Sequence, residues 1–503
     1  MSNGNTGLLK KLAGQTAIYG VSSILGRMLN WLLVPLHTRI FAEADYGTVT
    51  ELYSYVAFLN ILYTYGMETA YFRYVKESNQ HPDTVYNTAF ASLTASGLFM
   101  SAILIAMAQP IAMALQYPDN SEYIVYFGLI LALDTLVTIP FARLRYEEKA
   151  TRFATLRLIN IGINVGLNVF FFIVCPRMSG SPVFDALYDP NVGIGYIFLS
   201  NLIAALVTFL MLVPDMARAT LYSRTWRVLD AQLWRKMVIY ALPLLVVGFA
   251  GTINEMLDRI LFKHLYPADT TTTLQQLGIY GACYRLCIIM SLFTQAYRFA
   301  AEPFFFAQSN RENAPQVYAD SMKYFVIVGL TVLVGVPFFM DLVKLLIGSR
   351  YHEGLGVVPI LLLSHLLLGI YYNLSIWYKL TNHTTWGAII SVGGSLLTIA
   401  LNIALIPRYG YWGAAIANLV CYSAMTIASY IWGQKYYPIP YNLGRIAVYT
   451  AVAMGLIALN EWVLQPSHIA KLDLYAIRLV LLTAFLSAII WYERKTTALQ
   501  SLN

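Results

Sequence analysis

Residues 236–262 read KMVIYALPLLVVGFAGTINEMLDRILF, and no charged residue stands between Lys236 and Glu255. A transmembrane helix needs about 20 largely apolar residues at a rise of 1.5 Å per residue. This segment meets that requirement, and similar apolar runs lie near 13–36, 46–70, 85–108, 122–142, 153–174, 192–213, 276–299, 318–340, 355–378, 384–406, 411–434, 443–464 and 472–491. The sequence therefore predicts an all-α integral membrane protein with about 14 transmembrane helices.

The composition supports this class. Of the 503 residues, 58% are hydrophobic and only 12% are charged, whereas a soluble domain carries about 25% charged residues. This deficit excludes a soluble multidomain enzyme, because too few charges remain to cover its surface. No basic run is interleaved with aromatic residues in a polar segment, so no nucleic-acid partner is expected despite the net charge of +7. The four cysteines are too scattered for a zinc site or a disulfide framework, and we expect neither a metal nor a cofactor.

Lysines and arginines gather in alternate loops, about twenty on one side and eight on the other. Because positively charged loops stay in the cytoplasm, this asymmetry places both termini there. The connections are too short for a separate catalytic domain, which needs about 50 residues or more. The chain contains no Gly-Lys dipeptide and hence no phosphate-binding loop of the Walker type. Any transport work would therefore be driven by an ion gradient or by a partner.

A weak internal repeat divides the chain. Thr38-Arg39-Ile40-Phe41 at the end of the first span corresponds to Asp258-Arg259-Ile260-Leu261 at the end of the seventh. A spacing of six spans indicates two parallel, pseudo-symmetric six-helix lobes, with a cavity expected between them. The predicted order is an N-terminal lobe, a cytoplasmic linker, a C-terminal lobe and two extra C-terminal helices with the tail, over 1–215, 216–235, 236–435 and 436–503.

Charged residues inside spans are the first candidates for substrate binding, because a charge at the bilayer centre costs at least about 2.5–3.5 kcal/mol. Arg27 lies midway along the first span with Asn30 one turn away, and its guanidinium suits phosphate oxygens. It can equally lock two helices together by pairing with a carboxylate. Arg285 has no carboxylate nearby in the sequence, so its partner is another helix or the substrate.

Three further polar residues complete the substrate-binding candidates. Arg259 lies one turn after Glu255, so an internal ion pair competes with a role in binding. Asn160 and Asn164 share a face of the fifth span with Arg157. Their amides suit sugar hydroxyls, but in membranes such side chains also join helices to one another.

Coupling to a proton or a sodium ion needs a carboxylate that binds the ion in one conformation and releases it in another. The candidates inside or at the ends of spans are Asp134, Glu255, Asp258, Glu51 and Glu68. Asp134, in the middle of the fourth span, is the most buried of them by position. A desolvated carboxyl can also stay protonated and donate a hydrogen bond between helices.

Four prolines are predicted to lie inside spans, where each removes one backbone hydrogen bond and permits a kink. They are Pro35, Pro140, Pro243 and Pro337. Pro35 and Pro243 occupy corresponding spans of the repeat. We therefore expect the first and seventh helices to bend during transport.

Several of these motifs resemble those of a known family. Pro35-Leu36-His37-Thr38-Arg39, the following Tyr46-Gly47, the Asp258-Arg259 pair and Gly278-Ile279-Tyr280 are similar to the O-antigen type polysaccharide flippases. So is the pattern in which Asn402 is followed by Ile406-Pro407-x-Tyr409-Gly410-x-x-Gly413-Ala414-Ala415. These flippases belong to the multidrug/oligosaccharidyl-lipid/polysaccharide exporter superfamily, and the resemblance covers almost the whole chain.

The resemblance implies a multi-pass protein of the bacterial inner membrane, with two six-helix lobes and two extra helices. It implies alternating access that moves a polyprenyl-diphosphate-linked oligosaccharide from the cytoplasmic to the outer leaflet, for cell-surface polysaccharide or lipopolysaccharide synthesis. Its partners would be that substrate, membrane lipids, a coupling proton or sodium ion, and other polysaccharide assembly proteins. No catalytic residue is implied.

Three alternatives stay open at this point. A cation-coupled multidrug exporter of the related extrusion family would favour an acidic cavity, whereas Arg27 and Arg285 favour an anionic ligand. A membrane oligosaccharide polymerase or ligase would need a longer external loop than any in this chain. A scaffold or channel would leave the repeat and the intramembrane arginines without a role.

Overall fold

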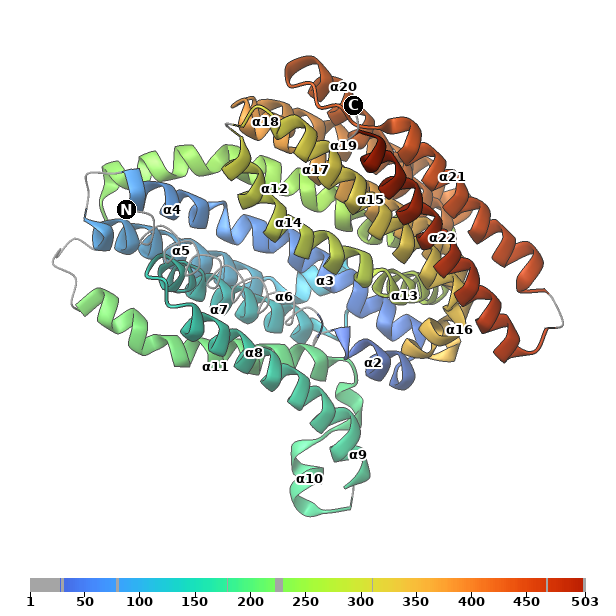
Figure 1. The fold of residues 1–503 in the computed structure, drawn as a ribbon. Coiled ribbons are helices and arrows are strands. Elements are labelled where there is room, and N and C mark those ends of the chain that lie inside the picture. The colour runs from blue at the N-terminus through green and yellow to red at the C-terminus, as the bar shows by residue number, and fades with distance from the viewer. Residues whose placement is uncertain are drawn as a thin grey trace. The chain divides into compact units, whose positions relative to one another are not determined.

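The computed structural model describes residue 28 and residues 31–77, 81–178, 180–221, 229–309, 311–466 and 469–500. The chain forms two compact units, Met1–Ile260 and Leu261–Asn503. In the described ranges every regular element is helical (Figure 1), which confirms the predicted all-α class. The division into lobes around a linker at 216–235 stays a prediction, and residues 222–228 of that linker lie outside the described ranges.

Unit 1 is built around a central helix, α7. Its helices are α2 (Val34–Ile40), α3 (Glu43–Thr64), α4 (Met67–Glu77), α5 (Pro82–Ala106), α6 (Ala108–Ala114), α7 (Ser121–Tyr146), α8 (Ala150–Val169), α9 (Cys175–Arg177), α10 (Pro182–Leu187), α11 (Gly195–Leu221) and most of α12 (Ala231–Leu265). Helix α7 packs against α5, α11, α3 and α8. Figure 1 shows α9 and α10 extending beyond α8 as a short helical excursion.

Small residues let α5 and α7 pack closely. A Cβ added to Gly97 of α5 would come within 2.9 Å of the Thr135 side chain on α7. One turn further along α5, the hydroxyl of Ser101 donates to the backbone carbonyl of Gly128 at 2.8 Å. Between membrane helices, close backbone approach and such hydrogen bonds replace the hydrophobic driving force that lipid removes.

Unit 2 holds the remaining helices. They are α13 (Thr270–Leu286), α14 (Ile288–Gln308), α15 (Ala314–Phe338), α16 (Met340–Val343), α17 (Val358–Leu374), α18 (Ile376–Leu380), α19 (Thr384–Tyr409), α20 (Tyr411–Tyr436), α21 (Leu443–Leu459) and α22 (Lys471–Gln500). Helix α20 packs between α17 and α19, while α21 and α22 pack against α15. The turn from α19 to α20 uses Gly410 at a φ of +57°, a conformation that favours glycine.

The number of membrane spans can be counted only in part. Eleven of the described helices are long and apolar enough to cross a membrane, and twelve if the bent pair α13 and α14 is one span. Helix α3, in the second predicted span, is not among them, because threonine, tyrosine, serine and Glu51 lower its hydropathy. Most of the first predicted span, 13–36, lies outside the described residues. The predicted total of 14 is therefore not confirmed.

Three of the four prolines predicted inside spans lie inside helices. Pro140, Pro243 and Pro337 do lie inside α7, α12 and α15. Pro35 does not: it stands in the first turn of α2, where a missing N–H costs no hydrogen bond. The sharp bend that prolines did not predict is one of 44° between α13 and α14, at Cys287.

Candidate functional site

The fourth and fifth predicted spans place two opposite charges on an open face of unit 1. Asp134 on α7 and Arg157 on α8 are both exposed, and their charges interact. The Arg157 guanidinium also lies over the Phe141 ring, 4.4 Å from its centroid. Asp134 was expected to be the most buried carboxylate. It is exposed instead, because the middle of α7 packs only part of its surface against α3, α5 and α11.

Intramembrane charges almost always face a protein cavity or a polar path rather than lipid. The exposed face of α7 and α8 that carries Asp134 and Arg157 is therefore a candidate lining for a polar path in unit 1.

The amides of the fifth span join helices and one another. Asn160 donates to the Thr208 hydroxyl of α11 at 2.9 Å. Asn168 donates to the backbone carbonyl of Asn164 at 2.8 Å, and its own amide oxygen meets His37 Nε2 at 2.8 Å. The backbone carbonyl of Asn164 can only accept a hydrogen bond, so the Asn168 amide nitrogen must face it and the amide oxygen must face His37. Because that oxygen also only accepts, His37 Nε2 is the donor and carries the proton. These contacts are those of helix-joining amides, and sugar binding by Asn160 and Asn164 stays a prediction.

Two of the ion-coupling candidates are held by partners within unit 1. Glu51 is fully buried in α3 and accepts a hydrogen bond from the Tyr117 hydroxyl. Glu68, at the start of α4, forms an ion pair with Arg145 at the end of α7. Both carboxylates therefore have a structural role that explains their positions.

The remaining candidates lie on α12 and α13. Glu255 is exposed, whereas Asp258 and Arg259 are buried. The Arg259 guanidinium donates to the backbone carbonyl of Glu255 at 3.2 Å. Arg285 is exposed near the end of α13, two residues before the break at Cys287. Interrupted helices mark substrate and ion sites in many transporters, so the break favours Arg285 as a site residue. Two further candidates, Arg27 and Asn30, lie outside the described residues.

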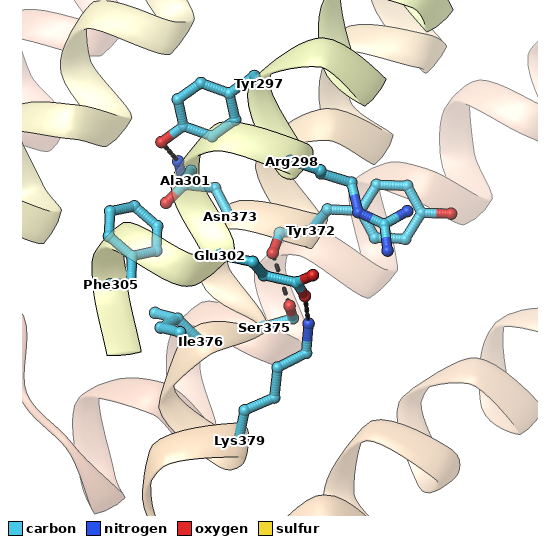
Figure 2. A pocket seen from close by; sticks show the side chains of 10 residues that line it. All are labelled: Tyr297, Arg298, Ala301, Glu302, Phe305, Tyr372, Asn373, Ser375, Ile376 and Lys379. Atoms are coloured by element: carbon cyan, nitrogen blue, oxygen red, sulfur yellow. Dashed lines mark hydrogen bonds and ion pairs between the residues drawn. The ribbon is translucent and has the colours of Figure 1, made fainter. Parts of the chain in front are cut away.

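A pocket in unit 2 was not predicted from the sequence. It lies between α14 and the broken helix formed by α17 and α18, as Figure 2 shows. Its charged and polar lining consists of Tyr297, Arg298, Glu302, Tyr372, Asn373, Ser375 and Lys379. Helices α14 and α18 both end on the side of the membrane that the distribution of lysine and arginine in the loops predicts to be cytoplasmic.

Two cations and one carboxylate line this pocket. The Arg298 guanidinium stacks on the Tyr372 ring, 4.0 Å from the centroid. Lys379 of α18 forms an ion pair with Glu302 of α14 (Figure 2). The lining therefore carries one more positive than negative charge.

Asn373 is one of the two deepest polar residues of the lining, since it and Ser375 are each only 3% exposed. Its amide nitrogen donates to the Tyr297 hydroxyl, which shares a hydrogen bond of 2.7 Å with Ser321 of α15. The Asn373 amide oxygen has no hydrogen-bond partner among the residues that the structure describes. Arg298 and Glu302 share one face of α14 at helical spacing, which was the only sequence signal for this pocket.

Metal ligands do not gather in the described part of the chain. No group of three or more histidine, cysteine, aspartate or glutamate side chains there could hold a metal ion. The four cysteines are buried and free.

Comparison with known proteins adds a family and a fold. The sequence pattern of the polysaccharide biosynthesis protein family matches residues 12–308. Lsg locus putative protein 1 of Haemophilus influenzae is 21% identical over 372 residues, which cover 73% of this chain and 84% of that protein.

Two solved structures share the fold at low sequence identity. The lipid II flippase MurJ in an inward closed conformation has a TM-score of 0.70 at 12% identity, over 94% of this chain and 98% of MurJ. A multidrug resistance MATE family transporter in an inward-facing conformation has a TM-score of 0.61 at 12% identity, over 86% of this chain and 95% of the transporter.

Proposed function

Because the chain belongs to the polysaccharide biosynthesis protein family, we propose that it is a flippase for a lipid-linked oligosaccharide. The substrate would be a polyprenyl-diphosphate-linked oligosaccharide, moved from the cytoplasmic to the outer leaflet for cell-surface polysaccharide synthesis. The observation that carries the proposal is the family match over 12–308. The fold shared with a lipid II flippase over 94% of the chain supports it.

The charges support an anionic headgroup path. Arg285 near the break in the eighth span and Arg27 in the first would hold the diphosphate. Arg157 on α8 is a further exposed cation suited to an anionic headgroup. The lipid tail would stay in the bilayer while two conformations alternately open the path to either side.

Coupling to a proton or sodium ion is part of the proposal. Asp134 and Glu255 are the carboxylates that best suit it, because both are exposed in the structure. Glu51 and Glu68 suit it less, because Tyr117 and Arg145 already engage them.

The test of function is depletion of the protein from its host, followed by mass spectrometry of the extracted lipids. Accumulation of a polyprenyl-diphosphate oligosaccharide is expected, and the wild-type gene should reverse it. Arg285→Ala should fail to reverse it and Arg285→Lys should do so partly, because lysine keeps the charge but loses the donor fork. Unchanged lipids together with new sensitivity to cationic drugs would instead favour the multidrug exporter, the alternative that the MATE likeness suggests.

We also propose the inner membrane as the location, with both termini in the cytoplasm. The four native cysteines are buried, so single added cysteines can be labelled with little background. Thr271→Cys should react with a membrane-impermeant maleimide in cells whose outer membrane has been permeabilised. Glu312→Cys should react only after lysis. The opposite pattern would reject this orientation.

A further inference from the structure

The pocket between α14, α17 and α18 contains cationic groups that its own carboxylate does not satisfy. Lys379 is paired with Glu302, but Arg298 has no carboxylate partner among the described side chains and rests on Tyr372 instead. A guanidinium stacked on a ring uses its face and keeps its N–H donors, which lie in its plane, available. An arginine held this way near the end of a membrane span calls for an anion.

The amide of Asn373 adds a second unsatisfied group. It is buried, it lines the pocket, and one of its two polar atoms has no partner in the described residues. The oxygen and nitrogen of an amide are exchangeable assignments. Turning the amide over keeps the hydrogen bond to Tyr297, with the phenol as donor, and presents an N–H group to the pocket.

We propose that this pocket binds a phosphate group, and that Glu302 is an internal substitute which the phosphate displaces from Lys379. Arg298 and Lys379 would bind the phosphate oxygens, and the Asn373 amide would donate the third hydrogen bond. The displaced Glu302 would turn toward solvent, since its side chain is already 41% exposed. The identity of the natural ligand rests on the proposed function. If that function holds, the phosphate belongs to the diphosphate of the lipid-linked oligosaccharide, bound at a different stage of transport from the one in which Arg27 and Arg285 hold it.

The small size of the pocket agrees with a site that its own side chains occupy. Its free volume is about 10 Å³, which is the space of one water molecule. A phosphate therefore enters only if a side chain leaves, and Glu302 is the one that carries the same charge. Carboxylate and phosphate are interchangeable partners for lysine and arginine.

The displacement has a structural consequence for α18. This helix of five residues begins at Ile376, after the break at Ser375, and Lys379 is its attachment to α14 by charge. The Ser375 hydroxyl donates to the backbone carbonyl of Tyr372 at 2.6 Å, which satisfies one of the carbonyls that the break exposes. Phosphate binding would exchange a contact between α14 and α18 for a contact with the ligand.

Binding to the purified full-length protein tests the proposal. The probe is geranylgeranyl diphosphate, and geranylgeraniol is the control without phosphate. Inorganic pyrophosphate and phosphatidylglycerol vesicles distinguish a free anion and a phospholipid headgroup as alternative sources of the phosphate. The diphosphate should bind and the alcohol should not, and failure of every phosphate-bearing probe would overturn the proposal.

Substitutions at Arg298 and at Glu302 should change the affinity for the diphosphate in opposite directions. Arg298→Ala should weaken binding by about tenfold, because one charge-assisted hydrogen bond is lost. Arg298→Lys should lose less, and it serves as the folded substitute should the alanine variant not fold. Glu302→Gln should strengthen binding by up to about fivefold, because a partly exposed ion pair no longer competes for Lys379. The matched control is Glu312→Gln, an exposed carboxylate in the loop after α14, which should change nothing.

A purely structural role for the Glu302 pair predicts the reverse. Binding that is unchanged or weaker in Glu302→Gln, with normal thermal unfolding, would reject the displacement. The two proposals fail separately. Lipid accumulation in depleted cells without phosphate binding at the pocket would reject only the pocket, whereas binding with the expected signs but no accumulation would reject only the flippase.

Discussion

Glu493 lies at the centre of the charge cluster that attaches the last helix, α22, to the rest of unit 2. Removing its carboxylate should therefore destabilise the unit. The Glu493 side chain on α22 is 7% exposed. It accepts from the Tyr449 hydroxyl at 2.6 Å, and it lies 2.8 Å from Lys323 Nζ and 3.4 Å from Arg445 Nη1. Glu493→Ala therefore leaves Arg445 without a carboxylate partner among the described side chains, and leaves Lys323 with only the half-exposed Asp320, 3.2 Å from its Nζ.

The expected cost of Glu493→Ala is about 3–5 kcal/mol, the usual penalty for breaking one side of a buried pair. For a unit of this size, that cost lowers the melting temperature by roughly 10 °C. Thermal unfolding followed by tryptophan fluorescence, in one detergent throughout, measures the shift. The control is Glu77→Ala, because Arg73 and Glu77 form an ion pair that is 45% and 63% exposed. Loss of that exposed pair should cost no more than about 1 kcal/mol.

A second substitution separates charge from packing. Lys323→Met added to Glu493→Ala removes the more buried of the two cations that lose Glu493, so the double variant should be more stable than the single one. The reasoning would be refuted by a Glu493→Ala shift no larger than that of the exposed pair. It would also be refuted if the added Lys323→Met restored nothing.

Three further predictions concern packing, pH and bending. Gly413→Ala should destabilise unit 2 by about 1–3 kcal/mol through overpacking, because its Cβ would lie 2.4 Å from the Leu405 backbone oxygen. Gly393→Ala should be neutral or slightly stabilising in the same unfolding assay, because nothing lies within 4 Å of that position. The hydrogen bond from Lys344, with a further contribution from Arg478, lowers the pKa of Asp341 below its usual 3.8. The stability that this interaction adds is therefore present above about pH 4, and it is lost as the pH falls through the lowered pKa of Asp341. The difference in melting temperature between the wild type and Asp341→Asn should accordingly vanish in acid. Pro243→Ala should slow lipid transport without lowering expression if α12 bends at Pro243, and a normal transport rate would exclude that bend.

Much of the fold followed from the sequence because membrane helices are decided locally. Each span must satisfy its backbone hydrogen bonds within itself, so an apolar run of the right length is already a helix. The spans predicted over 384–406 and 411–434 correspond to α19 and α20, which run from Thr384 to Tyr409 and from Tyr411 to Tyr436.

The bends were harder to predict from composition. Proline correctly marked an interior position in α12, yet the 44° bend of the eighth span occurs at Cys287, where no proline stands. Pro35, by contrast, stands in the first turn of α2. A proline only permits a bend, whereas the neighbouring helices decide whether a span takes one.

The sequence by itself determined the membrane class, the approximate spans and the family resemblance, because these depend on hydropathy and on short motifs. Only the tertiary structure decided which charges meet. Glu302 and Lys379 are far apart in the chain, and so are Lys323 and Glu493, yet helix packing makes each an ion pair. The helical repeat relates a residue only to others one turn away. The partner of a charge on a different helix is set by how the helices pack and which face each turns inward.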